Sequence, residues 1–273
     1  MLVRFLKAIA VRKRFPCHNE NFTMESLSVV IPAYNEERRL PASLDRIFAY
    51  ASRSPVPILE VLVVDDGSSD GTAALVESGV ASGKYPPILR LVKYAGNRGK
   101  GYAVREGMNQ AKGDWILSTD ADLSSPIEEV EKLLAAARAN QAAVLFGSRA
   151  VDRSLVRTRQ PFFREYSGRA FNLAMRAATG LPFLDTQCGF KLFRADAARE
   201  IFPRQMEDGF SFDVEDLVIA RARGLKMVEV PVVWSDVEGT KVSLVNGLRS
   251  FAHLLRIRWH AVSGRYSQKN TPS

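Results

Sequence analysis

The sequence has few of the residues that build covalent cross-links and zinc sites. Its 273 residues include two cysteines, Cys17 and Cys188, and three histidines. The cysteines lie far apart, and neither they nor the histidines follow the spacing of a metal-binding motif. The sequence therefore predicts neither a disulfide framework nor a zinc site, and we expect a reducing, cytosolic environment.

Long apolar runs are also absent. No segment approaches the run of about 20 apolar residues that a membrane-spanning helix needs. Near the N-terminus, Arg4 and Lys7 interrupt the apolar residues too early for the core of a signal peptide. We expect residues 1–24 to be a basic N-terminal extension, either a short helix in a membrane interface or a disordered segment.

Acidic residues are missing from both ends of the chain. Residues 1–19 hold five Lys or Arg and no acid, and the residues after Glu238 hold six and no acid. Of the 38 basic residues, 27 remain between these ends against 30 acidic ones, a net charge of −3. Basic ends on a slightly acidic core favour an anionic membrane surface as a partner over nucleic acid.

The residues that are plentiful indicate one large α/β domain. Hydrophobic residues make up 46% of the chain, enough for a full core. Five β-rich runs alternate with segments of helical spacing, which predicts a doubly wound, Rossmann-like and mainly parallel sheet flanked by helices. The runs cover residues 27–31, 59–64, 88–92, a stretch that begins at Trp115, and residues 143–147.

Polar side chains follow these strands at the points where they end. They are Tyr34 and Glu36, Asp66, Lys100, Asp120 with Asp122, and Arg149. Right-handed crossovers bring the loops after parallel strands to one edge of the sheet, which is where ligands bind in such folds. One of these residues alone would indicate a solvated turn, but all of them together predict a site in which paired carboxylates hold a divalent cation.

The motifs that carry these residues resemble those of the family 2 glycosyltransferases, which have the GT-A fold. The resemblance lies in VIPAYNEE at 30–37, VVDDGSSDGT at 63–72, NRGKG at 97–101 and DAD at 120–122. In the second half, DTQCGFKLF at 185–193, FDVE at 212–215 and EVPVVWSDVEGTK at 229–241 resemble the dolichyl-phosphate β-glucosyltransferases and their bacterial polyprenyl-phosphate relatives. The resemblance covers residues 27–260 and implies a GT-A domain over 25–241.

The resemblance implies roles for these positions on the donor side. Asp122 would bind Mg²⁺ or Mn²⁺, with Asp120 beside the metal or at the ribose, and the carboxylate of Asp66 would accept from a uracil N–H. Lys241 would reach a phosphate. The remaining residues expected to bind the nucleotide sugar are Pro32, Tyr34, Glu36, Val64, Lys100, Ala121 and Gln187.

The acceptor implied by the resemblance is a polyprenyl phosphate, which needs positive charge more than a base. Its second pKa is near ~6, as for phosphoserine, so it is anionic at neutral pH and attacks without a strong general base. Arg149, Arg164 and Arg169 are the candidates to hold it, although Arg164 and Arg169 also fit an exposed basic helix face. Asp213 and Glu215 would lie on the floor of the active site and join Asp120, Asp122 and Arg149 as candidate catalytic residues.

Residues 242–273 are expected to form a basic amphipathic segment. One helical stripe holds Leu244, Leu248, Phe251, Leu255, Trp259 and Val262. Such a stripe either packs on the catalytic core or contacts a membrane.

These expectations combine into one reaction. It is the inverting transfer of glucose from UDP-glucose to dolichyl or polyprenyl phosphate by a cytoplasmic enzyme peripherally bound to the membrane. GDP-mannose is an alternative donor, and a homo-oligomer is compatible with the sequence. A nucleotidyltransferase is an alternative of another class, but it would need a glycine-rich basic loop after the first strand, where this chain has the acidic Tyr34-Asn-Glu36. A non-catalytic nucleotide-sugar-binding module is a third alternative.

Overall fold

The computed structural model describes residues 25–158, 172–173, 175–236 and 245–267, without the side chains of 245–251. The strands are β1 (Leu27–Ala33), β2 (Ile58–Asp65), β3 (Leu89–Lys93), β4 (Trp115–Ser118), β5 (Val144–Ser148), β6 (Val156–Thr158), β7 (Lys191–Arg194), β8 (Met227–Pro231) and β9 (Trp234–Ser235). The helices are α1 (Leu40–Ala51), α2 (Thr72–Ala81), α3 (Lys100–Gln110), α4 (Val130–Asn140), α6 (Ala195–Ile201), α7 (Phe212–Ala222) and α8 (Val245–Val262). Among the described residues, no helix is long and apolar enough to cross a membrane.

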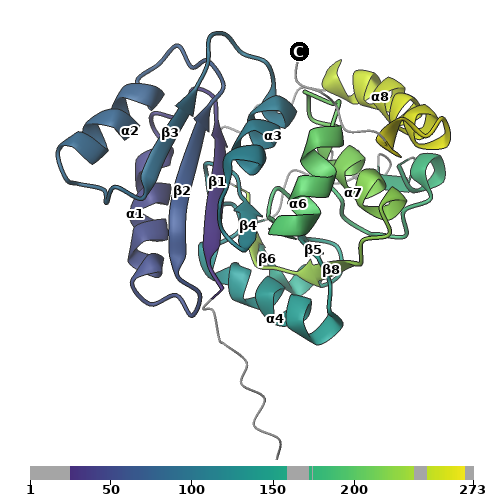
Figure 1. Ribbon diagram of the computed structural model, residues 1–273, viewed down its shortest axis with the longest axis horizontal. Coiled ribbons are helices and arrows are strands. Elements are labelled where there is room, and N and C mark those ends of the chain that lie inside the picture. The colour runs from purple at the N-terminus through teal and green to yellow at the C-terminus, as the bar shows by residue number, and fades with distance from the viewer. Residues whose placement is uncertain (1–24, 159–171, 174, 237–244, 268–273) are drawn as a thin grey trace, which may run out of the picture.

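The described strands form a central sheet in the order β3-β2-β1-β4-β7-β5-β8, with β6 and β9 pairing separately. Strands β3, β2, β1 and β4 are mutually parallel, as are β5 and β8. Helices cover both faces (Figure 1). Strand β1 is buried along its whole length, as its almost unbroken apolar sequence requires for a strand covered on both faces.

Each face of the sheet has its own hydrophobic core, because neighbouring residues of a strand point to opposite faces. Val29 and Ile31 of β1 pack in one cluster with Leu40 of α1 and Leu133 of α4. Val30 packs in the other cluster with buried residues of α3, α6 and α7. The expected fold class, a mainly parallel sheet between helical layers, is confirmed.

The strands differ from the expectation in two ways: β1 is longer than predicted, and β6, β7, β8 and β9 are not among the five predicted runs. β1 runs past Pro32 to Ala33 because the Ala33 carbonyl still accepts from the Asp66 N–H at 2.8 Å, so proline, which lacks only a donor, does not end the strand. β7 was not expected, and it lies antiparallel between β4 and β5. Its four residues are too few for a periodic signal, and its place in the sheet depends on long-range pairing.

Helix α8 has a buried apolar side and an exposed one, and the described part of the predicted stripe lies on the exposed side. Leu254 and Ile257 of α8 are buried in the core cluster of α7, whereas Leu255, Trp259 and Val262 are 65%, 54% and 80% exposed. The described part of the stripe therefore faces away from the core. Residues 1–24, the helix start expected after Pro161, and Leu244 lie outside the described residues, and the division into segments at 24 and 242 stays a prediction.

Candidate active site

The strand-end residues meet at the carboxyl edge of the sheet, the upper edge in Figure 1. The register aligns the strand ends, since Ala33 pairs with Asp65 and Val30 pairs with Ser118. The loops that follow β1, β2 and β4 therefore leave the sheet side by side. The residues expected to bind the nucleotide sugar begin at this edge, among them Pro32 and Val64, which are neighbours across β1 and β2.

The loop after β1 is fastened to the loop after β2 through backbone N–H groups. Asn35 N donates to Ser68 Oγ at 2.9 Å, and Glu36 N donates to Thr72 Oγ1 at 2.9 Å. Asn35 has a φ of 55°, a conformation that asparagine tolerates better than most residues. Tyr34, 40% exposed, thus stands on a backbone that two hydrogen bonds position.

Asp66 is buried and organises the loop that carries Lys100. Its Oδ1 accepts from Tyr94 Oη at 2.9 Å and from Arg98 N at 2.7 Å, and its Oδ2 accepts from Gly99 N at 2.9 Å. A carboxylate has about four acceptor positions, so one position on Oδ2 remains for a further donor. The contact with a uracil N–H stays a prediction, and these bonds add a structural role that the sequence did not indicate.

Gly99 lets this loop turn into α3 and direct Lys100 toward Asp120. Its φ of 108° is accessible to glycine, and a Cβ there would lie 2.4 Å from the Asp208 carbonyl oxygen. Lys100 Nζ lies 2.6 Å from Asp120 Oδ1. Burial by itself would lower the pKa of Lys100, but Asp120 and Asp213 outweigh it and raise that pKa.

Asp120 lies against the backbone of Gly189 and among cations. A Cβ on Gly189 would lie only 2.3 to 2.7 Å from the three carboxylate atoms of Asp120. Burial favours a raised pKa for Asp120, but Lys100, Lys191 and Arg149 prevail and lower it. Asp120 is therefore ionised at neutral pH, in a position that a side chain at residue 189 would block.

Asp122 is held from both sides. Its Oδ1 accepts from Ser124 N at 3.0 Å and from Ser124 Oγ at 2.9 Å, while its Oδ2 lies 3.7 Å from Arg39 Nη1. Arg39 also donates to Glu36 through Nε at 2.7 Å and Nη2 at 2.5 Å. Arg39 thus links the loops after β1 and β4. Sequence reasoning missed it because an arginine at the start of a helix carries no distinguishing signal.

Asp120 and Asp122 together fit a cation that is shared with a substrate. No group of three or more His, Cys, Asp or Glu within the described ranges could hold a metal ion without other ligands. Mg²⁺ commonly takes one or two protein carboxylates and fills its other positions with substrate phosphates and water. Two carboxylates one residue apart are a suitable donor set for Mg²⁺ or Mn²⁺ bound with a diphosphate.

Arg149 is paired rather than free. Its Nε and Nη2 lie 2.7 and 2.8 Å from the two oxygens of Asp185, a bidentate pair, and its Cζ lies 5.4 Å from the Trp234 ring centroid. Burial by itself would lower the pKa of Arg149, but Asp185 raises it, so the guanidinium stays charged. Asp185 is the first residue of the DTQCGFK block, whose acid was a signal that the sequence reasoning did not use.

That block also places Lys191 and Gln187. Lys191 is buried, forms an ion pair with Asp213, and donates to the Cys188 carbonyl at 2.7 Å. Gln187 is exposed, and its N–H donates to Asp185 Oδ1 at 3.2 Å. Asp213 and Asp120 therefore each have a lysine partner, consistent with a polar floor below the strand ends.

Glu215 forms hydrogen bonds to the backbone of residues 206–207 and to Tyr266. Its Oε2 accepts from Met206 N at 2.9 Å and from Glu207 N at 2.7 Å, and its Oε1 accepts from Tyr266 Oη at 2.9 Å. Burial raises the pKa of Glu215 to about 7. These bonds fasten residues 206–207 and the C-terminal region to α7, and its catalytic assignment stays a prediction.

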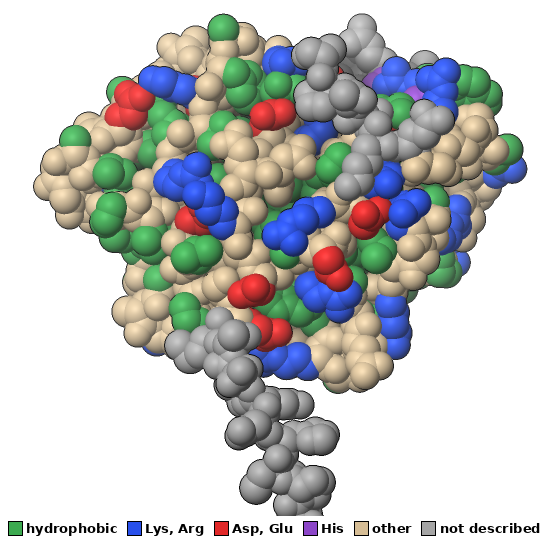
Figure 2. Space-filling view, in the orientation of Figure 1, with side chains coloured by type: hydrophobic (Ala, Val, Ile, Leu, Met, Phe, Trp, Pro, Cys, Tyr) green, Lys and Arg blue, Asp and Glu red, His purple; other side chains and the backbone are tan. Residues whose placement is uncertain are grey.

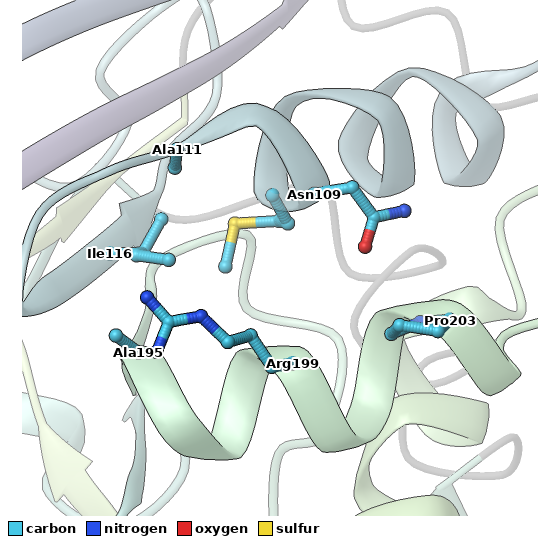
Figure 3. Close-up of a pocket in the computed structure, with 7 residues that line it drawn as sticks. Asn109, Ala111, Ile116, Ala195, Arg199 and Pro203 are labelled. Atoms are coloured by element: carbon cyan, nitrogen blue, oxygen red, sulfur yellow. The ribbon is translucent and has the colours of Figure 1, made fainter. Parts of the chain in front are cut away.

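Four expected site residues remain, one of them buried and three outside the described residues. Ala121 is buried and its carbonyl accepts from Ser43 Oγ at 2.6 Å. Lys241, Arg164 and Arg169 lie outside the described residues. A cavity of about 280 Å³, shown in Figure 3, contains none of the expected site residues. It is lined by Met108, Asn109, Ala111, Ile116, Ala195, Arg199 and Pro203.

The sequence of this chain is similar to those of known proteins. The chain matches the family described as Glycosyl transferase family 2 over residues 28–202. It is 34% identical over 278 residues to dolichyl-phosphate beta-glucosyltransferase of Homo sapiens, covering 98% of this chain and 85% of that protein. Dolichyl-phosphate beta-glucosyltransferase ALG5C of Trichomonas vaginalis is 36% identical over 249 residues, covering 88% and 73%.

The fold is shared with solved structures as well. Glucosyl-3-phosphoglycerate synthase from Mycobacterium tuberculosis, in complex with Mn²⁺ and UDP-glucose, matches with a TM-score of 0.60 at 19% identity, covering 92% of this chain and 82% of that chain. Mannosyl-3-phosphoglycerate synthase from Rubrobacter xylanophilus matches with a TM-score of 0.64 at 19% identity, covering 91% and 78%. With the match over residues 28–202, this chain belongs to glycosyl transferase family 2 and is a glycosyltransferase.

Proposed function

We propose that this chain transfers glucose from UDP-glucose to dolichyl or polyprenyl phosphate with inversion at the anomeric carbon. The observation that carries the proposal is the contact between Asp120 and Gly189. It joins the acid pair, which many sugar transferases have, to the DTQCGFK block, which resembles the lipid-phosphate glucosyltransferases. The relatives that match most of the chain at 32–36% identity are named dolichyl-phosphate beta-glucosyltransferases.

On the donor side, the proposal uses residues after β1, β2 and β4. Asp66 accepts the uracil N–H at its remaining position, and Tyr34 and Glu36 border the base and ribose. Asp120 and Asp122 would hold Mg²⁺ or Mn²⁺ together with the donor pyrophosphate. When bound, the cation neutralises the negative charge that grows on the leaving UDP. The mycobacterial enzyme with this fold binds Mn²⁺ and UDP-glucose, which supports this choice.

On the acceptor side, the proposal uses fixed positive charge. An oxygen of the lipid phosphate forms a bond to C1 of glucose while the bond from C1 to the β-phosphate oxygen of UDP breaks and its electrons leave with UDP. Attack from the opposite face converts an α-linked donor into a β-linked product. Arg149, held by Asp185, orients the acceptor phosphate with Arg164 and Arg169, and Lys241 contacts the donor phosphate.

The location follows from the acceptor. A polyprenyl phosphate carries its phosphate at the surface of a bilayer, so the proposed enzyme binds peripherally to a membrane, and the side that we propose is the cytoplasmic one.

Radiolabelled sugar donors test the donor and the reaction class together. Purified chain is incubated with UDP-glucose or GDP-mannose and a short polyprenyl phosphate, with and without EDTA. The proposal expects an organic-soluble, EDTA-sensitive product from UDP-glucose. A product from GDP-mannose alone would show that GDP-mannose, not UDP-glucose, is the donor. Release of pyrophosphate from a nucleoside triphosphate and a sugar phosphate would show that the chain is a nucleotidyltransferase.

A further inference from the structure

The outer side of α8 carries an apolar strip that no described residue covers. The strip consists of Leu255, Trp259 and Val262, which are 65%, 54% and 80% exposed. Their spacing of four and three residues places them on one side of the helix, while Leu254 and Ile257 on the other side are buried. We propose that this outer strip binds the surface of an anionic lipid bilayer, with α8 lying in the plane of the membrane.

Charge beside the strip is complementary to anionic lipid. Residues 252–267 contain Arg256, Arg258 and Arg265 and no acid. The guanidinium carbon of Arg265 lies 4.5 Å from the Trp259 ring centroid, so an indole and a cation face the solvent together. Figure 2 shows blue, purple and green side chains gathered at the upper right, over the position of α8 in Figure 1. Apolar side chains flanked by arginine are the pattern of helices that lie in a membrane interface.

A bilayer fits this surface better than a second copy of the chain. Two copies joined strip to strip would bring Arg258 and Arg265 toward the same residues of the partner copy, with no acid in residues 245–267 to offset them. An anionic lipid headgroup supplies the opposite charge, and its acyl region accepts the apolar side chains.

Helix α8 is attached to the rest of the protein through Glu207, a buried acid. Arg256 Nε donates to Glu207 Oε1 at 2.7 Å, and His253 Nδ1 lies 2.9 Å from Glu207 Oε2. Arg258 Nη1 donates to the Ala178 carbonyl at 2.7 Å on the other side of the helix. The helix is therefore held in one orientation, with the strip outward.

The same attachment leads to the candidate active site. Residue Asp208, next to Glu207, accepts through its carbonyl from Gly101 N at 2.8 Å and Tyr102 N at 3.2 Å, in the first turn of α3. Lys100 of that turn contacts Asp120. Figure 1 shows α8 at the same end of the molecule as the carboxyl edge of the sheet. Resting on the proposed function, this placement brings the lipid phosphate to the site when the strip touches the bilayer.

Vesicle binding tests the inference without donor or acceptor. The full chain is sedimented with vesicles of phosphatidylcholine, with and without phosphatidylglycerol, and the variants are Trp259→Glu and Leu255→Glu. Leu59→Glu is the matched control, because Leu59 of β2 is 45% exposed and lies far from α8 in sequence. We expect binding that needs phosphatidylglycerol, falls at high salt, drops more than about tenfold in both strip variants and is unchanged in the control.

Three results would overturn the inference. The first is equal binding of the strip variants and Leu59→Glu, provided that at least one strip variant melts at the temperature of the parent chain. The second is equal binding to vesicles without phosphatidylglycerol. The third is a parent chain that is dimeric by light scattering and becomes monomeric in Trp259→Glu while neither binds vesicles, which would make the strip a subunit interface.

An activity measurement separates this inference from the proposed function. We expect Trp259→Glu to lower transfer to a long-chain polyprenyl phosphate in vesicles and to preserve transfer to a short, water-soluble prenyl phosphate. Equal losses on both acceptors would contradict a role at the membrane. If the parent chain uses neither acceptor, the proposed function fails, and the vesicle-binding result still decides the inference.

Discussion

Gly189→Ala is a small change with a large expected effect. The φ of Gly189 lies outside the left-handed region, so alanine adds no backbone strain of that kind. Its Cβ would, however, lie 2.3 Å from Asp120 Oδ2, where ordinary contact begins at 3.4 Å. The carboxylate of Asp120, or the segment that carries Gly189, must therefore move by about 1 Å.

A displacement of that size at a reacting centre costs on the order of a hundredfold in rate. We expect kcat/KM for glucosyl transfer from UDP-glucose to fall by about that factor, and the affinity for Mn²⁺ in the presence of UDP to fall as well. Gly209→Ala is the control, because a Cβ at Gly209 would meet no atom of the described residues within 4 Å. Activity of Gly189→Ala equal to that of Gly209→Ala would refute the placement of Asp120 in the site.

Three further experiments test how burial and ion pairing change the ionisation of Asp185, Asp216 and Cys188. Asp185→Asn breaks the ion pair with Arg149 and should lower the free energy of unfolding by about 3 kcal/mol at pH 7. Because the pair lowers the Asp185 pKa, this loss of stability should shrink below about pH 4, which urea titrations will measure. Asp216→Leu should raise the melting temperature, since neither oxygen of this buried carboxyl has a hydrogen-bond partner among the described residues. The gain should grow with pH because burial raises the Asp216 pKa above its unfolded value. A gain independent of pH would contradict this. Burial raises the Cys188 pKa to about 11, so native Cys188 should resist iodoacetamide at pH 8, as peptide mass spectrometry will show; alkylation as fast as in urea would contradict it.

The layout of the sheet could be predicted because local patterns determine it. Apolar runs such as the one ending at Val64 identify buried strands, and alternation with helices brings their ends to one edge. The proximity of Lys100 and Asp120 followed from that rule alone, without knowledge of either side chain's partners.

The partners themselves could not be predicted, because they join residues far apart in the chain. Asp185 meets Arg149 across 36 residues, and Glu215 meets Tyr266 across 51. Hydrophobic period and turn chemistry carry no information on such pairs. For the same reason the sequence showed an apolar stripe on α8 but not that Leu255 and Trp259 face outward.

In the proposed reaction, Asp122 and its neighbours form the site of a metal-dependent transfer to a lipid phosphate. The most direct test is the rate of glycolipid formation from labelled UDP-glucose and polyprenyl phosphate by the parent chain and by Asp122→Ala, each at saturating Mn²⁺. We expect an EDTA-sensitive parent rate and a loss of at least about a hundredfold in the variant. A variant as active as the parent chain would contradict the assignment of Asp122 as a metal ligand.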